Sequence, residues 1–215
     1  MLAPDLFGHA PAPKPVFQPR ADLIATFHAL RPAGGADLIM ADPPWSYDMR
    51  SEAGYGKSPE AHYDTLPLEV IAGFPVELLA ARNAVLWLWA LGPQLPQALA
   101  VIDAWGFTFK TSGHWAKTTK HGKQAFGTGY ILRNAGEPFI IATRGAPKTT
   151  RGVRSVIIAP GGRGSGREHS RKPDQAYAEA ERLMPNAQRL DLFSRQNRPG
   201  WTSWGNEAGK FGGDP

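Results

Sequence analysis

Short, uninterrupted apolar runs that alternate with segments of helical periodicity constrain the fold of this chain more than any other feature. Two of these runs, residues 37–41 and 84–90, are bounded by turn residues and are too short for helices of ordinary length. Runs without polar alternation are typical of strands that are buried on both faces. Because such strands alternate with helices, we predict an α/β fold: a Rossmann-like, doubly wound, mostly parallel sheet with helices on both faces.

The same patterns place the elements along the chain. We predict helices at residues 22–30, 67–82, 93–105 and 173–184, and further strands at 107–117, 138–143, 153–159 and 187–193. Residues 118–134 and 161–170 fit neither period and predict loops. Five prolines between Pro4 and Pro19 predict an extended or mobile arm over residues 1–20, so that one domain spans residues 21–215.

The composition narrows the classes of function. The chain has no cysteine, which excludes disulfides, thiolate zinc sites and cysteine nucleophiles, and its histidines lack metal-ligand spacing, so we expect no metal site. It shows neither a signal peptide nor an apolar run long enough to span a bilayer, so we expect a cytoplasmic protein with no membrane partner. A net charge of +5 and a pI near 9.6 permit a polyanionic partner such as nucleic acid.

The sequence Asp42-Pro43-Pro44-Trp45 follows the first apolar run and stands where a strand ends, the usual place for a ligand in such a sheet. An aromatic amine is a poor nucleophile because its lone pair is delocalised into the ring. Asp42 and a backbone carbonyl of the motif could each accept one amine hydrogen and draw the nitrogen toward tetrahedral geometry. The prolines lack amide hydrogens and stiffen the loop, and Trp45 offers a face on which a flipped-out base could stack. We therefore predict these four residues as catalytic, although the tetrapeptide also suits an ordinary turn.

Further motifs accompany this one in order along residues 37–207. They are Val85-Leu86-Trp87-Leu88-Trp89, a glycine-flanked strand between Gly129 and Gly145, His169-Ser170-Arg171-Lys172-Pro173-Asp174, Leu190-Asp191-Leu192-Phe193-Ser194-Arg195, and Gly205-Asn206-Glu207. With these motifs the chain resembles the family of the catalytic subunit of the mRNA N6-adenosine methyltransferase (the Asp-Pro-Pro-Trp type, or MT-A family) and its bacterial and phage relatives. The resemblance implies methyl transfer from S-adenosylmethionine to the exocyclic N6 amine of adenine in nucleic acid, with DNA favoured over RNA.

The resemblance also implies where the cofactor binds. In this family the catalytic strand comes first and the cofactor strand last, a permuted (beta-class) order that builds the site from both chain ends. The implied cofactor residues are Asp42, Lys172, Arg195, Asn197, Asn206 and Glu207. Lys172 precedes a predicted helix and could meet the methionine carboxylate, while the residues after the last strand could reach the ribose and adenine. The chain departs from the family pattern in a shorter stretch at 195–201 and in Glu207, which replaces an amide side chain.

Substrate contacts are predicted from four further positions. Tyr63 matches a family position near the target base, and Lys57 could contact a phosphate. The glycine-rich segment 161–167 carries Arg163 and Arg167, which could clamp a nucleic-acid backbone, although such a segment could equally be a flexible hairpin tip.

Two other functions remain open at the level of sequence. N4-cytosine methyltransferases use a related acidic or polar residue followed by Pro-Pro and an aromatic ring for the same amine chemistry. The family also contains catalytically inactive partner subunits that bind nucleic acid with the same fold but have lost the acidic motif. Intact Asp42, Lys172 and Arg195 favour an active enzyme. A homodimer or a partner subunit remains possible.

Overall fold

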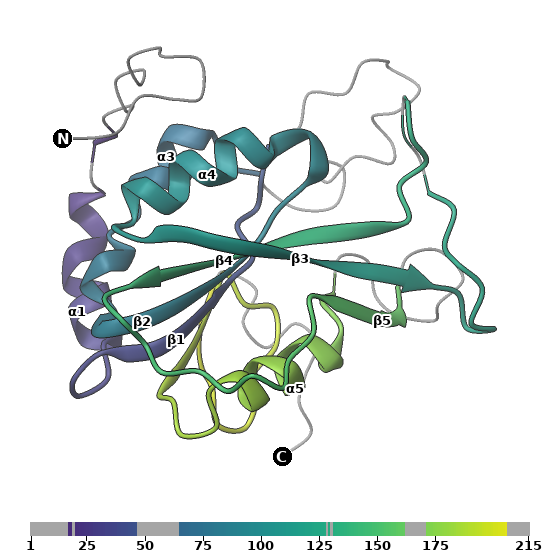
Figure 1. Cartoon of the computed structure of the whole chain (residues 1–215). Helices are drawn as coiled ribbons and strands as arrows, with labels where there is room; N and C mark the ends of the chain where they lie inside the picture. Colours follow the sequence, from purple (N-terminus) through teal and green to yellow (C-terminus); the bar gives the residue numbers. More distant parts are fainter. Residues whose placement is uncertain are drawn as a thin grey trace, which may run out of the picture.

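Seven strands form one sheet in the order β5-β3-β4-β2-β1-β6-β7 in the computed structural model of the chain (Figure 1). The structure describes residues 17–18, 20–46, 65–127, 129, 131–161 and 171–205. Its strands are β1 (Ala36–Ala41), β2 (Ala80–Trp89), β3 (Thr108–Thr118), β4 (Gly136–Arg144), β5 (Val156–Pro160), β6 (Arg189–Leu192) and β7 (Thr202–Trp204). Its α-helices are α1 (Ile24–Leu30), α3 (Leu68–Ala72), α4 (Leu95–Ala104) and α5 (Asp174–Leu183), with single 3-10 turns at Ala21–Leu23, Val76–Leu78 and Gly92–Gln94.

The direction of the strands brings their ends to a common edge. β1 pairs in parallel with β2 and β6, β3 pairs in parallel with β5, and β6 pairs in parallel with β7. Among the strands of the described residues, β4 alone runs the other way, antiparallel to β2 and β3. The carboxyl ends of the other strands and the amino end of β4 therefore lie along one side of the sheet, which we call the carboxyl edge.

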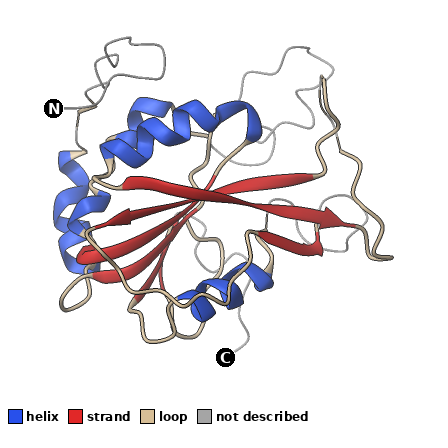
Figure 2. Ribbon diagram, viewed as in Figure 1, coloured by secondary structure: helices blue, strands red, loops and turns tan. Residues whose placement is uncertain are grey.

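Two hydrophobic cores cover the two faces of the sheet, because successive residues of a strand point to opposite sides. On one face, Ile39 and Leu86 pack beneath α1, α3 and α4. On the other face, Met40 and Trp87 pack with Ala176 of α5. Figure 2 shows this division, with helices above and below the strands. The predicted α/β class, with a mostly parallel sheet between helices, is confirmed.

Residues 67–82 were predicted as one helix, and this prediction is wrong. α3 ends at Ala72, a 3-10 turn follows, and β2 already begins at Ala80, which pairs with Ala36 of β1. Pro75 ends the helix, because a proline disfavours helical geometry at the residue before it. Beside it, Gly73 lies so close to the Gln18 carbonyl that a Cβ there would be 2.4 Å from it.

The other bounds agree with the sequence to within a few residues, except that β7 was not predicted. β7 has three residues and pairs with β6 through Leu190 and Thr202, and a segment of that length shows no readable periodicity. The predicted arm at residues 1–20 lies almost entirely outside the described residues. In the part of the chain that the structure describes, no helix is long and apolar enough to cross a membrane.

Candidate active site

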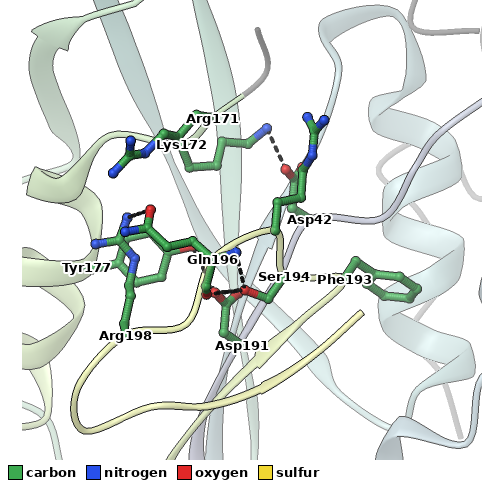
Figure 3. A pocket seen from close by; sticks show the side chains of 10 residues that line it. Asp42, Arg171, Lys172, Tyr177, Asp191, Phe193, Ser194, Gln196 and Arg198 are labelled. Atoms are coloured by element: carbon green, nitrogen blue, oxygen red, sulfur yellow. Dashed lines mark hydrogen bonds and ion pairs between the residues drawn. The ribbon is translucent and has the colours of Figure 1, made fainter. Parts of the chain in front are cut away.

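Asp42 is the first residue after β1 and lies at the carboxyl edge. Its backbone N–H donates to the carbonyl of Leu192, the last residue of β6, at 3.2 Å. This hydrogen bond holds the start of the motif against the end of β6. The Asp42 side chain is 26% exposed, and one of its oxygens lies 2.8 Å from the Lys172 Nζ (Figure 3). The structure thus joins a residue after the first strand to one that precedes α5.

This ion pair is the end of a longer series of alternating charges. Lys172 also lies 3.1 Å from Glu137, and Glu137 lies 2.5 Å from Lys117. Lys117 stands near the end of β3 and Glu137 at the start of β4, so the antiparallel turn of the chain places both at the carboxyl edge. Lys117, Glu137 and Lys172 are between 9% and 17% exposed, so three of the four charged groups are largely shielded from water.

Burial and neighbouring charges set the protonation of the two carboxyls. Burial raises the pKa of Asp42 above its ordinary value, and the Lys172 ammonium opposes that rise. Burial acts in the same direction on Glu137, but Lys172 and Lys117 together outweigh it and lower its pKa to about 2. Glu137 is therefore a negative charge beside Lys172, while Lys172 only partly offsets the effect of burial on Asp42.

The two prolines and Trp45 build a rigid turn. The Pro43 carbonyl accepts the Trp45 N–H at 2.9 Å, and the Pro44 carbonyl accepts the Leu66 N–H at 2.8 Å. Trp45 is 5% exposed, packs within the core on the α4 side, and donates its indole N–H to the Trp89 carbonyl at 3.1 Å. This differs from the open stacking face expected from the sequence, because the ring anchors the motif to the end of β2. Stacking of a base on Trp45 stays a prediction.

A second polar cluster lies behind Asp42. Asp191 is 2% exposed within β6, and its Oδ2 accepts the Tyr177 hydroxyl at 3.0 Å and the Ser194 hydroxyl at 2.8 Å. Burial raises the pKa of Asp191 to about 7, although both hydroxyl groups act against the rise. A carboxyl of this kind changes charge near neutral pH.

The loop after β6 closes the cluster. Phe193 adopts φ 60°, a left-handed conformation that non-glycine residues seldom occupy and that is typical of functional loops. The Ser194 N–H donates to the Trp204 carbonyl at 3.0 Å, which holds this turn against β7. Arg198 lies 2.7 Å from Asp174 and 3.8 Å from the centre of the Tyr177 ring, so it links the loop to the first turns of α5.

These groups line one pocket at the carboxyl edge (Figure 3). Its walls are Asp42, Arg171, Lys172, Tyr177, Asp191, Phe193, Ser194, Arg195, Gln196 and Arg198. Asp42, Lys172 and Arg195, which were predicted from distant parts of the sequence, are therefore neighbours. Asn197 belongs to the same loop but is exposed and is not among the lining residues.

Other predicted positions lie outside the described residues. These are Lys57, Tyr63, Arg163, Arg167, Asn206 and Glu207. Their roles stay predictions. Among the described residues, no group of three or more histidine, aspartate or glutamate side chains could hold a metal ion.

The sequence reasoning missed several groups of the site. Asp191 carried a usable signal, since a carboxylate between two leucines in a buried strand needs partners. Glu137 carried a weaker signal as the only acidic residue between Asp103 and Glu168. Tyr177 and Arg198 gave none, because a helix face and a polar loop commonly contain such residues.

Comparison with known proteins identifies the family of the chain. Residues 36–207 match the MT-A70 family, a span that runs from β1 through β7 and includes the whole pocket. The chain belongs to the MT-A70 family.

Individual MT-A70 relatives are similar over most of this chain. The N(6)-adenosine-methyltransferase MT-A70-like protein of Arabidopsis thaliana is 29% identical over 87% of this chain and 24% of its own length. The human N(6)-adenosine-methyltransferase catalytic subunit METTL3 is 26% identical over 79% of this chain and 28% of its own length. The type II methyltransferase M.MunI of Mycoplasma sp is 28% identical over 79% of this chain and 76% of its own length. This chain thus spans about a quarter of the plant and human proteins but most of M.MunI.

Proposed function

We propose that this protein transfers a methyl group from S-adenosylmethionine to the exocyclic N6 amine of adenine in nucleic acid. The observation that carries the proposal is the Asp42 carboxylate, held 2.8 Å from Lys172 beside the Pro43-Pro44 turn at the carboxyl edge. Family membership supports it, since the relatives named above include adenosine N6 methyltransferases.

The residues of the motif supply the acceptors that the amine requires. Asp42 accepts one amine hydrogen, and Lys172 partly offsets the effect of burial on its carboxylate. The Pro43 and Pro44 carbonyls each already accept one backbone N–H, so the second lone pair of one of them takes the other amine hydrogen. With both hydrogens held, the nitrogen lone pair is directed out of the plane of the base.

The pocket suits S-adenosylmethionine by the chemistry of its lining. That ligand carries a carboxylate, an ammonium and a sulfonium, and it supplies the methyl group when bound. The pocket offers cationic Lys172, Arg195 and Arg198 within the same depression as anionic Asp42, a pairing of signs that fits a zwitterion. Lys172 and Arg195 would hold anionic and hydroxyl groups, and Asp42 would lie at the end where the methyl group is transferred.

The proposal is tested by incubating the protein with methyl-labelled cofactor and with matched single-stranded DNA and RNA. We expect label in adenine nucleosides, identified by mass spectrometry as N6-methyladenine, and none in oligonucleotides whose adenines already carry that methyl group. The DNA and RNA arms decide which polymer is the substrate; we expect DNA to be the better one. Label in cytosine would instead identify the N4-cytosine reaction.

Asp42→Ala serves as the catalytic control. Because Asp42 draws out the amine lone pair, its removal should abolish turnover while cofactor affinity stays within about tenfold of wild type. A variant that keeps a tenth of wild-type turnover would contradict the mechanism. Inactivity of the wild-type protein with every base, together with intact strand binding, would instead identify the inactive binding subunit.

The site of action and any partner belong to the same proposal. We propose that the protein works in the cytoplasm, which its lack of cysteine suits. A second copy or another subunit stays a prediction that mass measurement in solution would test.

A further inference from the structure

Positive charge is concentrated in one part of the chain. Residues 104–167 contain 11 of the 24 lysines and arginines but one of the 19 acidic residues, so they carry +10 and the rest of the chain carries −5. These residues include β3, β4 and β5, which form one side of the sheet. The modest net charge of the whole protein therefore hides a strongly basic region beside an acidic remainder.

The β3–β4 loop, residues 119–135, is the part of this region that continues from the candidate site. It contains Lys120, His121, Lys123 and Arg133 and no aspartate or glutamate. It leaves the sheet just after Lys117 and returns just before Glu137. These two residues form an ion pair, and Glu137 is joined through Lys172 to Asp42. Figure 1 shows the loop projecting beyond the sheet from the ends of these two strands.

Backbone hydrogen bonds organise the loop into two turns. The Thr119 N–H donates to the Lys123 carbonyl at 2.8 Å, and the Gly127 N–H donates to the Asn134 carbonyl at 2.8 Å. Between the turns, the Ala125 N–H donates to the Lys117 carbonyl at 2.9 Å, which attaches the loop to the end of β3. The exposed side chains of the loop are thus carried on a backbone that is joined to the end of β3, next to the series of charges that leads to Asp42.

An aromatic ring lies beside one of these cations. Phe126 is 80% exposed, and the Arg133 guanidinium lies 5.5 Å from the centre of its ring. Exposed aromatic rings beside lysine and arginine are the usual binding elements for single-stranded nucleic acid, because bases stack on the rings while phosphates meet the cations. Ile131 and Leu132, which are 86% and 81% exposed, add apolar surface to the same loop.

We propose that the β3–β4 loop binds the nucleic-acid strand beside the target adenine. Lys120, Lys123 and Arg133 contact phosphates, and Phe126 stacks on an unpaired base. The inference rests on the proposed function for the identity of the strand, and it adds a binding surface outside the pocket that holds Asp42.

The test compares two variants that lose the same charge. The loop variant combines Lys120→Ala, Lys123→Ala and Arg133→Ala. The control variant combines Lys110→Ala, Lys148→Ala and Arg151→Ala, exposed residues near the start of β3 and between the end of β4 and the start of β5, at the opposite edge of the sheet. Fluorescence anisotropy measures the affinity for a short adenine-containing single strand, as DNA and as RNA, over a series of salt concentrations.

We expect the loop variant to lose about tenfold or more in affinity at low salt. The slope of log affinity against log salt should flatten by about 2, since three phosphate contacts to a single strand contribute about 0.7 each. The control variant should keep the wild-type slope and affinity. Phe126→Ala should weaken binding about tenfold without changing the slope, because stacking releases no counterions.

Several results would overturn the proposal. If the loop and control variants lost equal affinity for the strand, binding would depend on the overall charge of the protein and not on the loop. If the slope of log affinity against log salt stayed unchanged in the loop variant, the three loop residues would not contact phosphates. If Ile131→Ser with Leu132→Ser changed the mass of the protein in solution and the loop variant bound the strand normally, the loop would be a protein interface. A wild-type protein that binds no strand would also overturn it. Strand binding that depends on the loop, in a protein that methylates no adenine, would contradict only the proposed function.

Discussion

Lys172 is the residue at which the charges of the candidate site converge. It lies within ion-pair distance of both Asp42 and Glu137, and its ammonium is 5.4 Å from the centre of the Trp89 ring. Glu137 in turn is held by Lys117, so the four charged groups balance in pairs. Because two of these groups are carboxylates within ion-pair distance of one ammonium, the position of Lys172 depends on both of them.

Glu137→Gln tests this dependence. The Glu137 charge raises the pKa of Asp42, so its removal should lower that pKa and move the acid limb of the pH–rate profile to lower pH. Lys172 also loses one of its two anionic partners, and we expect catalytic efficiency at the optimum to fall by about tenfold. The measurement is kcat/KM for methyl transfer as a function of pH.

Glu69→Gln is the matched control, because Glu69 is an exposed residue of α3. It should leave both the rate and the acid limb unchanged. An acid limb that stays in place in Glu137→Gln, or moves to higher pH, would show that Glu137 does not act on Asp42.

At the scale of one element, β6 carries a buried carboxyl group between two apolar residues. Asp191 lies between Leu190 and Leu192, both fully buried, and its hydroxyl partners come from α5 and from the loop that follows the strand. The two leucines of the strand thus belong to the hydrophobic cores, while Asp191 lines the pocket.

Asp191 makes the stability of the fold depend on pH. Its pKa is about 7 in the folded chain against 3.8 as the ordinary value, so its contribution to stability is present at low pH and is lost as pH rises through about 7. The melting temperature of the wild type should therefore fall as pH rises from about 4.5 to about 7, and this contribution should level off above that pH. Asp191→Asn cannot ionise and should flatten this fall, with about 2–4 °C for each kcal/mol removed.

Glu137 does not contribute to the fall in melting temperature over this pH range. Its pKa is lowered to about 2, so its contribution is lost only as pH falls toward that value. Thermal unfolding followed by circular dichroism over the pH series provides the measurement. If Asp191→Asn kept the full pH dependence of the wild type, the ionisation would belong to another group.

At the scale of the whole molecule, the sheet brings the two halves of the site together. Asp42 follows the first strand, whereas Lys172 and Arg195 come from the last third of the chain, and β1 lies directly beside β6. The central position of β1 in the sheet makes this meeting possible, since its neighbours on the two sides are β2 and β6.

Arg195→Ala and Lys172→Ala test whether the later half holds the cofactor. Each should raise the dissociation constant for S-adenosylmethionine by about tenfold or more, equivalent to about 1.4 kcal/mol, because a charge-assisted hydrogen bond is lost. Affinity for an oligonucleotide should stay near that of the wild type. Calorimetric titration with the cofactor and then with an oligonucleotide measures both.

Arg182→Ala, an exposed position on α5, is the control and should bind the cofactor normally. Lys172→Ala also leaves Asp42 and Glu137 without their shared cation, so a loss of about 3–5 kcal/mol in stability is expected and a thermal melt must accompany its titration. If oligonucleotide binding were weaker and cofactor binding normal, Lys172 and Arg195 would contact the nucleic acid and not the cofactor.

The sequence by itself determined the strands β1 to β6, apart from the first residues of β2, and the place of the motif, because the patterns that mark them are local. A strand buried on both faces is apolar along its whole length, and a Pro-Pro pair after it stops the strand at a known residue. Hence β1, β2 and the position of Asp42 at a strand end could be predicted.

Tertiary structure alone decided which charges meet and which aromatic rings are covered. Lys117, Glu137, Lys172 and Asp42 lie on separate segments, and periodicity records only which face of an element is buried, not which distant group covers it. For the same reason the burial of Trp45 against Trp89, and the close approach of Gly73 to the Gln18 carbonyl, could not be read from the residues nearby. Ion pairs and close backbone contacts form only after the strands have taken their order in the sheet.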